Sequence, residues 1–119
     1  MHVQDFVVKL ELDGTLAVMS MQGDLTNESK TRVINAYERV LSAKARHILL
    51  DFSHTEYINS AGMSVLITLL TRAQEADQDL RAFGLSPHFQ KIFDMVGLLK
   101  YIPHFEDRAS ALASLEKDR

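Results

Sequence analysis

A serine at the predicted start of a helix is the residue of this chain best suited to carry chemistry. An apolar run over 48–50 continues through Asp51 to Phe52 and is typical of a buried strand. After a short loop, an apolar-periodic helix begins near Ser60. Unpaired amides at a helix start point outward and favour negative charge. A phosphate on the Ser60 hydroxyl, or bound beside it, would be stabilised there.

The neighbours of Ser60 leave a purely structural interpretation open. Serine is a common helix cap, and Ser60 could do no more than that. Asn59 could cap equally well, which would leave Ser60 free. Ala61 and Gly62 keep the helix start small, although a glycine in a helix costs about 0.5–1 kcal/mol relative to alanine. Gly62 therefore predicts a close approach of backbone or ligand, or crowding against the sheet.

A hydrolytic role for Ser60 is a further alternative. The segment over 59–62 lacks the glycine two residues before serine that a nucleophile elbow requires. His54 lies near Asp51 and Ser60 in the sequence, so a triad-like cluster would predict turnover of activated esters. The five histidines show no metal-ligand spacing, and no glycine-rich phosphate loop occurs. We expect no catalytic residue, no metal and no cofactor.

Strand and helix signals alternate along the chain. The expected elements are strands over 6–12 and 15–21 joined at Asp13-Gly14, a helix capped by Thr26 or Asn27, a strand over 47–52, a helix over about 60–76, a strand over 79–83, a helix from Ser86-Pro87 to Gly97, an edge strand over 101–105 and a helix over 107–117. This order, β-β-α-β-α-β-α-β-α, predicts an α/β fold with a mixed sheet, in which a hairpin precedes parallel, helix-covered strands.

The apolar spacing within each expected helix predicts which side chains face the core. The inward positions are Val33, Ile34, Tyr37, Val40 and Leu41 in the first helix, Val65, Leu66, Leu69, Leu70 and Ala73 in the second, Phe89, Ile92, Phe93 and Val96 in the third, and Leu112 and Leu115 in the last.

Composition restricts the classes of protein that fit. The chain has 119 residues, 46% of them hydrophobic, which suits one domain over 1–119 with its core over about 3–115. The formal net charge is −3, and the longest basic cluster, over 44–47, is too short for a nucleic-acid footprint. Cysteine is absent, and no signal peptide or membrane-spanning apolar run is evident. We therefore expect a cytoplasmic protein with no direct nucleic-acid binding and no membrane insertion.

Three motifs resemble the signature of the STAS domain family, whose best-known members are bacterial anti-sigma factor antagonists. They are Gly23-Asp24-Leu25 after the second expected strand, Asn59-Ser60-Ala61-Gly62 at the helix start, and Ser86-Pro87 followed by Phe-Asp-Met-Val-Gly-Leu over 93–98. They occur in the family's order, and the likeness covers about residues 3–115. The resemblance implies a STAS-like α/β domain, and a standalone chain of this length looks most like the antagonist branch.

The resemblance also implies a partner and a switch. In the antagonist branch, the protein binds an anti-sigma factor, often a serine kinase of the histidine-kinase-like ATPase type, and thereby frees a sigma factor for transcription. Phosphorylation of the serine at the helix start breaks the complex, and a serine phosphatase restores it. Ser60 matches that phosphoacceptor, and Asn59, Ala61 and Gly62 surround it. The partner surface implied by the resemblance comprises Gly23, Asp24, Leu25, Asn59, Ser60 and Met63.

Asn59 departs from the family pattern, in which the residue before the acceptor is often aspartate. Asparagine keeps the shape and the capping capacity but loses the charge. The change could alter partner or kinase recognition, or relieve repulsion against a phosphate on Ser60. STAS domains also occur in sulfate transporters, stress complexes and lipid-transport machinery. The alternative function is therefore a constitutive STAS scaffold, or a subunit of a stress, signalling or transport complex, without a phospho-switch.

Overall fold

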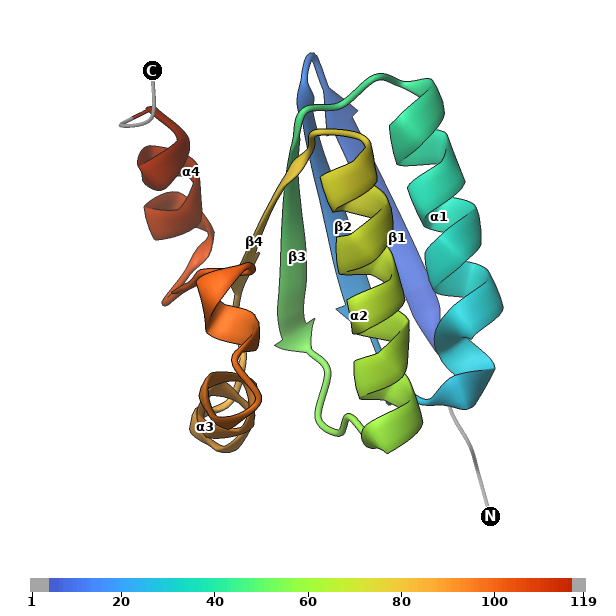
Figure 1. The fold of residues 1–119 in the computed structure, drawn as a ribbon, viewed down its shortest axis with the longest axis vertical. Coiled ribbons are helices and arrows are strands. Elements are labelled where there is room, and N and C mark those ends of the chain that lie inside the picture. Colours follow the sequence, from blue (N-terminus) through green and yellow to red (C-terminus); the bar gives the residue numbers. More distant parts are fainter. Residues whose placement is uncertain (1–4, 117–119) are drawn as a thin grey trace.

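A five-stranded mixed sheet forms the framework of the protein (Figure 1). The computed structural model describes residues 5–116. The strands are β1 (Val7–Asp13), β2 (Leu16–Gln22), β3 (His47–His54), β4 (Asp79–Phe83) and β5 (His104–Phe105), and they lie in this order across the sheet. β1 and β2 are antiparallel, and each later pair is parallel. The predicted α/β class, opening hairpin and element order are confirmed.

Helices connect the parallel strands and cover the sheet. Within residues 5–116 they are the 3₁₀ helices η1 (Asn27–Ser29) and η2 (Leu98–Lys100) and the α-helices α1 (Lys30–Ser42), α2 (Ser60–Glu75), α3 (Pro87–Met95) and α4 (Arg108–Glu116). In Figure 1, α1 and α2 lie side by side, whereas α3 and α4 lie toward the β4 side of the sheet.

The central strand β3 separates two apolar cores. Ile48 and Leu50 belong to the larger core, which β3 shares with α1, α2 and α3. Leu49 points to the other face and packs with Val18, Phe83 and Ala111 of α4. All three β3 side chains are fully buried. The prediction that this strand is covered on both faces is therefore confirmed.

Short-range signals set most of the element boundaries. Gly14, with a φ of +58°, is the first residue of the tight turn between β1 and β2. Thr26 caps η1 by accepting a hydrogen bond from the Glu28 amide, and Ser86 caps α3 ahead of a proline in its first turn. Gly97, in the left-handed conformation, ends the third helical segment as predicted.

The strand expected over 101–105 is wrong in its first half. Only His104 and Phe105 pair with β4. The Tyr101 and Ile102 amides instead donate hydrogen bonds to the Leu98 carbonyl, because η2 continues the chain as a tight turn after Gly97. The boundaries elsewhere shift by one or two residues. Lys117, at the end of the last expected helix, lies outside the described residues.

Two of the side chains expected to face inward are exposed. Val96 has 60% of its surface exposed, because α3 ends at Met95 and the chain turns away before Val96 can complete the buried stripe. Leu41 also lies on the solvent side, since the buried stripe of α1 runs through Val33, Tyr37 and Val40. No helix within residues 5–116 has both the length and the apolarity to cross a membrane.

His104 gives the fold a defined pH dependence. Its Nε2 accepts a hydrogen bond from the Leu85 amide at 3.1 Å, which requires a neutral ring, and burial lowers the pKa of His104 below 6.5. Between that lowered pKa and 6.5, the unfolded chain binds a proton that the folded chain does not. The contribution of His104 to the free energy of unfolding should therefore be fully present above pH 6.5. It should decline as the pH falls toward the folded-state pKa.

Urea unfolding at a series of pH values compares the wild type with His104→Gln, which keeps a neutral acceptor. We expect the wild type to lose more stability than the variant between pH 6.5 and pH 5. Equal pH slopes for the two proteins would contradict this role for His104.

Candidate functional site at the start of α2

Two loops meet at the end of the sheet from which α2 begins. The Gly23 amide donates to the His54 carbonyl at 3.0 Å, and the Leu25 amide donates to the Tyr57 carbonyl at 2.9 Å. The Asn59 amide returns a hydrogen bond to the Leu25 carbonyl at 3.2 Å. The loop after β2 and the loop after β3 are thus held together by their backbones. This arrangement fixes the start of α2, at the lower end of the helix in Figure 1.

Gly62 packs directly against the first of these loops. A Cβ atom on Gly62 would lie only 2.1 Å from the Leu25 carbonyl oxygen, far inside van der Waals contact. The glycine is buried, so its lack of a side chain lets the helix backbone approach the Leu25 backbone. The close backbone approach predicted for Gly62 is confirmed.

Asn59 caps α2 and leaves Ser60 outside that role. Asn59 has an extended backbone, and its Oδ1 accepts a hydrogen bond from the Gly62 amide at 2.8 Å. Ser60 is the first helical residue and is exposed. Within residues 5–116, no hydrogen bond involves the Ser60 hydroxyl. The interpretation of Ser60 as the cap is therefore wrong, because the preceding residue makes the capping contact.

The helix start also offers unused donors. The Ser60 and Ala61 amides carry no hydrogen bond within the described part of the chain, as expected for the first turn of a helix. The Gly62 amide is occupied by Asn59. An anionic group on Ser60 would therefore find two nearby amides and the positive end of the α2 dipole.

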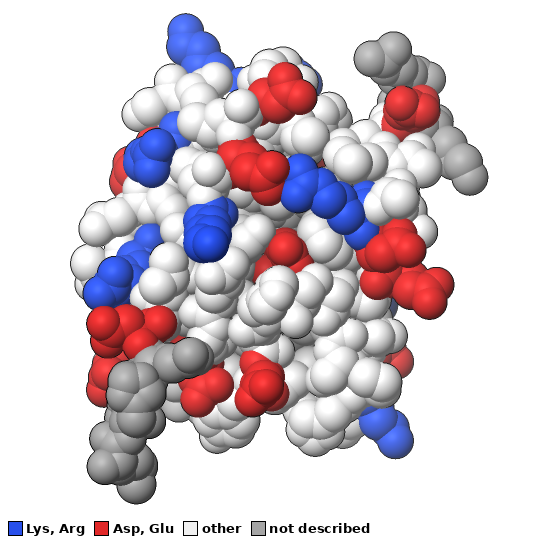
Figure 2. All heavy atoms as spheres, turned by 180° about the vertical axis from the view of Figure 1, so that it is seen from behind, with Lys and Arg blue, Asp and Glu red and all other residues white. Residues whose placement is uncertain are grey.

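An acidic groove is lined by residues of the same two loops that fix this helix start. It has a volume of about 560 Å³, and its lining includes Asp5, Asp24, Glu56, His54 and Gly23. Figure 2 shows the molecule from behind, with several acidic side chains toward its lower end. The surroundings of Ser60 thus combine local helix-start amides with a wider negative surface.

The expected surface residues differ in what they can present to a partner. Asp24 is exposed, Gly23 is half-buried, and Met63 packs partly against the core. Leu25 is wholly buried, with 0% exposure, so its side chain cannot contact a partner and it contributes through its backbone. Tyr57, which belongs to none of the sequence motifs, is 52% exposed in the loop after β3. A large aromatic side chain directly after Glu56, close to the expected helix start, was the available signal.

The triad-like alternative finds no support in the geometry. The Asp51 carboxylate accepts hydrogen bonds from the Ser20 hydroxyl at 3.1 Å and from the Ser53 amide at 2.8 Å. Among residues 5–116, no hydrogen bond joins His54 to Asp51 or to Ser60. In the same range, no cluster of three or more His, Asp or Glu side chains is arranged to hold a metal ion.

Comparison with known proteins assigns the chain to a family. A family model described as "Mlab, STAS domain" matches residues 8–103. The chain belongs to the STAS domain family. The match includes β2, β3, β4, the paired loops and the Ser60 helix start, so the resemblance seen in the motifs is confirmed.

Proteins described as anti-sigma factor antagonists resemble the chain over nearly its whole length. BtrV of Bordetella bronchiseptica, assigned to the anti-sigma factor antagonists, is 24% identical over 106 residues, which cover 89% of this chain and 90% of BtrV. The anti-sigma F factor antagonist of Paenibacillus polymyxa is 20% identical over 110 residues, covering 92% and 94% of the two chains. The crystal structure of an anti-sigma factor antagonist from Mycobacterium paratuberculosis superposes with a TM-score of 0.80 at 17% identity, covering 94% and 95%.

Replacing the two neighbouring residues separately tests the division between cap and free hydroxyl. Asn59→Ala should lower the free energy of unfolding by about 1 kcal/mol, because the Gly62 amide loses its acceptor. Ser60→Ala should change it by less than about 0.5 kcal/mol, as for other exposed sites. Urea denaturation of both variants measures the difference. A loss for Ser60→Ala as large as that for Asn59→Ala would contradict the assignment.

Proposed function

We propose that the protein is an anti-sigma factor antagonist that is switched off by phosphorylation of Ser60. In its unmodified form it binds an anti-sigma factor, a serine kinase of the histidine-kinase-like ATPase type, and so frees a sigma factor. A serine phosphatase removes the phosphate and restores binding. The observation that carries the proposal is that Ser60 exposes a hydroxyl with no hydrogen bond within residues 5–116, at a helix start already capped by Asn59. The relatives that span the chain are anti-sigma factor antagonists, which supports the same role.

The site can accept a phosphate without refolding. No hydrogen bond within residues 5–116 uses the Ser60 hydroxyl, so its modification breaks no hydrogen bond among these residues. Phosphoserine carries about −1.5 to −2 charges and three acceptor oxygens at neutral pH. The Ser60 and Ala61 amides can donate to these oxygens, and the α2 dipole stabilises the charge. The modified and unmodified proteins should therefore share one fold.

A partner packed over Ser60 would be expelled by the same group. It would meet added bulk, and it would have to desolvate a strongly hydrated dianion. A loss of about 3 kcal/mol weakens binding by more than a hundredfold. The proposed partner surface includes the exposed Asp24, Ser60 and Tyr57, with Gly23, Asn59 and Met63 around them. Its acidic groove suits a partner with basic side chains at the rim of the interface.

Asn59 fits the phospho-switch on electrostatic grounds. Its Oδ1 makes the capping contact that aspartate would make, yet the residue is neutral. A carboxylate at this position would stand next to a phosphate on Ser60, in surroundings that already contain Asp24 and Glu56. Asparagine thus keeps the helix cap while it avoids one more negative charge.

The rival function is a constitutive STAS scaffold or assembly subunit in which Ser60 serves only to cap its helix. The capping contact of Asn59 removes the structural reason for a serine at position 60 and favours the switch. As an antagonist the protein would act by binding, in the cytoplasm, without catalysis of its own. It would regulate transcription without touching DNA.

Substitutions at Ser60 test the switch through partner binding. Ser60→Asp should weaken binding of the host's anti-sigma factor kinase at least tenfold, because it adds a desolvated charge to the interface. Ser60→Ala should bind at least as well as the wild type and should not respond to ATP. Isothermal titration of each variant with the purified kinase measures the affinities. Ser42→Asp, an exposed charge at the end of α1 far from Ser60, is the matched control. Equal affinities for Ser60→Asp and Ser60→Ala would contradict the proposal.

A further inference from the structure

β1 leaves one edge of the sheet open. Within residues 5–116, β1 is the terminal strand and pairs with β2 alone. None of its seven residues is fully buried. In an antiparallel pair, every second residue directs its N–H and C=O toward the neighbouring strand, so the alternate residues of β1 direct theirs to the free edge. Such an edge can accept another extended strand.

The sequence of β1 is complementary to itself in the antiparallel direction. The segment Val8-Lys9-Leu10-Glu11-Leu12 places its charges and its apolar side chains symmetrically around Leu10. If two copies pair about a two-fold axis at Leu10, Lys9 of each copy lies opposite Glu11 of the other. Val8 of each copy then lies opposite Leu12 of the other. Residues directly opposite share one face of the sheet, so unlike charges meet and apolar groups meet.

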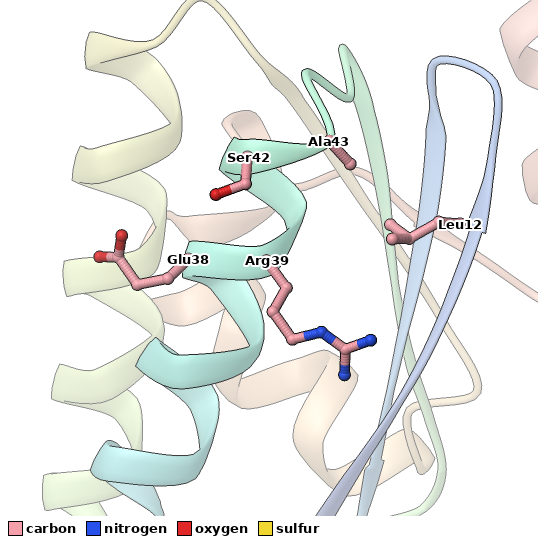
Figure 3. A pocket seen from close by; sticks show the side chains of 5 residues that line it. All are labelled: Leu12, Glu38, Arg39, Ser42 and Ala43. Atoms are coloured by element: carbon pink, nitrogen blue, oxygen red, sulfur yellow. The ribbon is translucent and has the colours of Figure 1, made fainter.

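The two faces of β1 suit these pairs. Val8 and Leu10 pack partly against the larger core on the face covered by α1, and Leu12 follows them on that face. Leu12 is 44% exposed and lines an open groove of about 410 Å³ with Glu38 and Arg39 of α1. Figure 3 shows this groove, with Arg39 extending from α1 toward the strands. The edge near Leu12 is therefore accessible, and Val8 of a second copy would cover Leu12.

The opposite face of β1, which carries Lys9 and Glu11, is compatible with the same pairing. Lys9 is exposed and takes part in no ion pair within the described part of the chain. Glu11 accepts two hydrogen bonds from Arg108, at 2.9 and 3.0 Å, and these hold the pKa of Glu11 below its usual value. Each carboxylate oxygen keeps a further lone pair on which a second donor can bind. Arg108 thus fixes Glu11 as an anion at the position that Lys9 of a second copy would approach.

We propose that β1 is a self-pairing edge through which two copies of this chain form an antiparallel, two-fold dimer centred on Leu10. Its central contacts are two Lys9–Glu11 pairs and two Val8–Leu12 pairs. The pairing would join the two sheets into one ten-stranded sheet. It would leave both Ser60 surfaces open, because the two-fold axis sends them to opposite ends. The dimer goes beyond the proposed switch and does not depend on it.

Charge reversal tests the pairing with a built-in rescue. Lys9→Glu alone places glutamate opposite glutamate twice in the dimer, and Glu11→Lys alone places lysine opposite lysine twice. An equimolar mixture of the two variants restores both unlike pairs in a mixed dimer. Sedimentation equilibrium of the 119-residue chain at neutral pH and low salt measures each association constant. We expect the wild type to dimerise and each single variant to dimerise roughly tenfold less well or worse.

The mixture should recover wild-type association, which a variant that had merely unfolded could not do. Arg108→Ala, which removes the partner of Glu11 within the chain but keeps the Lys9–Glu11 contact, should still dimerise. Thermal melts of each protein at low concentration check its fold. A wild type that stays monomeric up to about 1 mM would overturn the proposal. So would a dimer indifferent to both charge reversals, since it would use another surface, or a mixture that does not recover.

Discussion

The position of Ser60 depends on the backbone contact between two loops that lie far apart in the sequence. The Leu25 carbonyl oxygen accepts a hydrogen bond from the Asn59 amide. The same oxygen lies only 2.1 Å from the position that a Cβ atom on residue 62 would take. The Leu25 side chain is buried beneath this contact. The loop after β2 therefore fixes where α2 begins relative to the sheet. A residue larger than glycine at position 62 would have to move the helix start, and Ser60 with it.

That constraint separates two tasks that helix starts often combine. Asn59 completes the hydrogen bonds of the first turn, whereas Ser60 presents its hydroxyl to solvent. The fold can then tolerate a large change of charge at Ser60, because no hydrogen bond within residues 5–116 depends on its hydroxyl. In the proposed complex a partner would tolerate the charge less well, since it would pack on this surface and exclude water. The proposed switch thus assigns rigidity within the protein and sensitivity at its surface to adjacent residues.

Much of the fold could be predicted from the sequence because its signals are local. The buried run of β3, the turn at Gly14, the Ser86-Pro87 start and the Gly97 stop each act within a few residues, and each was confirmed. The errors arose where distant contacts or chain geometry determine where an element begins or ends. Val96 fits the apolar spacing of α3, but the helix ends one residue earlier. Tyr101 and Ile102 have strand-forming side chains, but η2 draws their amides back to Leu98.

The candidate site was predictable in its identity and less so in its roles. The motif marks Leu25, yet its burial follows from a loop more than thirty residues further along the chain. Asn59 and Ser60 are equally good caps by residue type, and only the geometry assigns the contact to Asn59. The most direct test of the central claim is site-resolved phosphopeptide mass spectrometry of the protein purified from its own host with phosphatase inhibitors. We predict that the purified protein carries phosphate on Ser60. A Ser60 that stays unmodified across growth and stress conditions would contradict it.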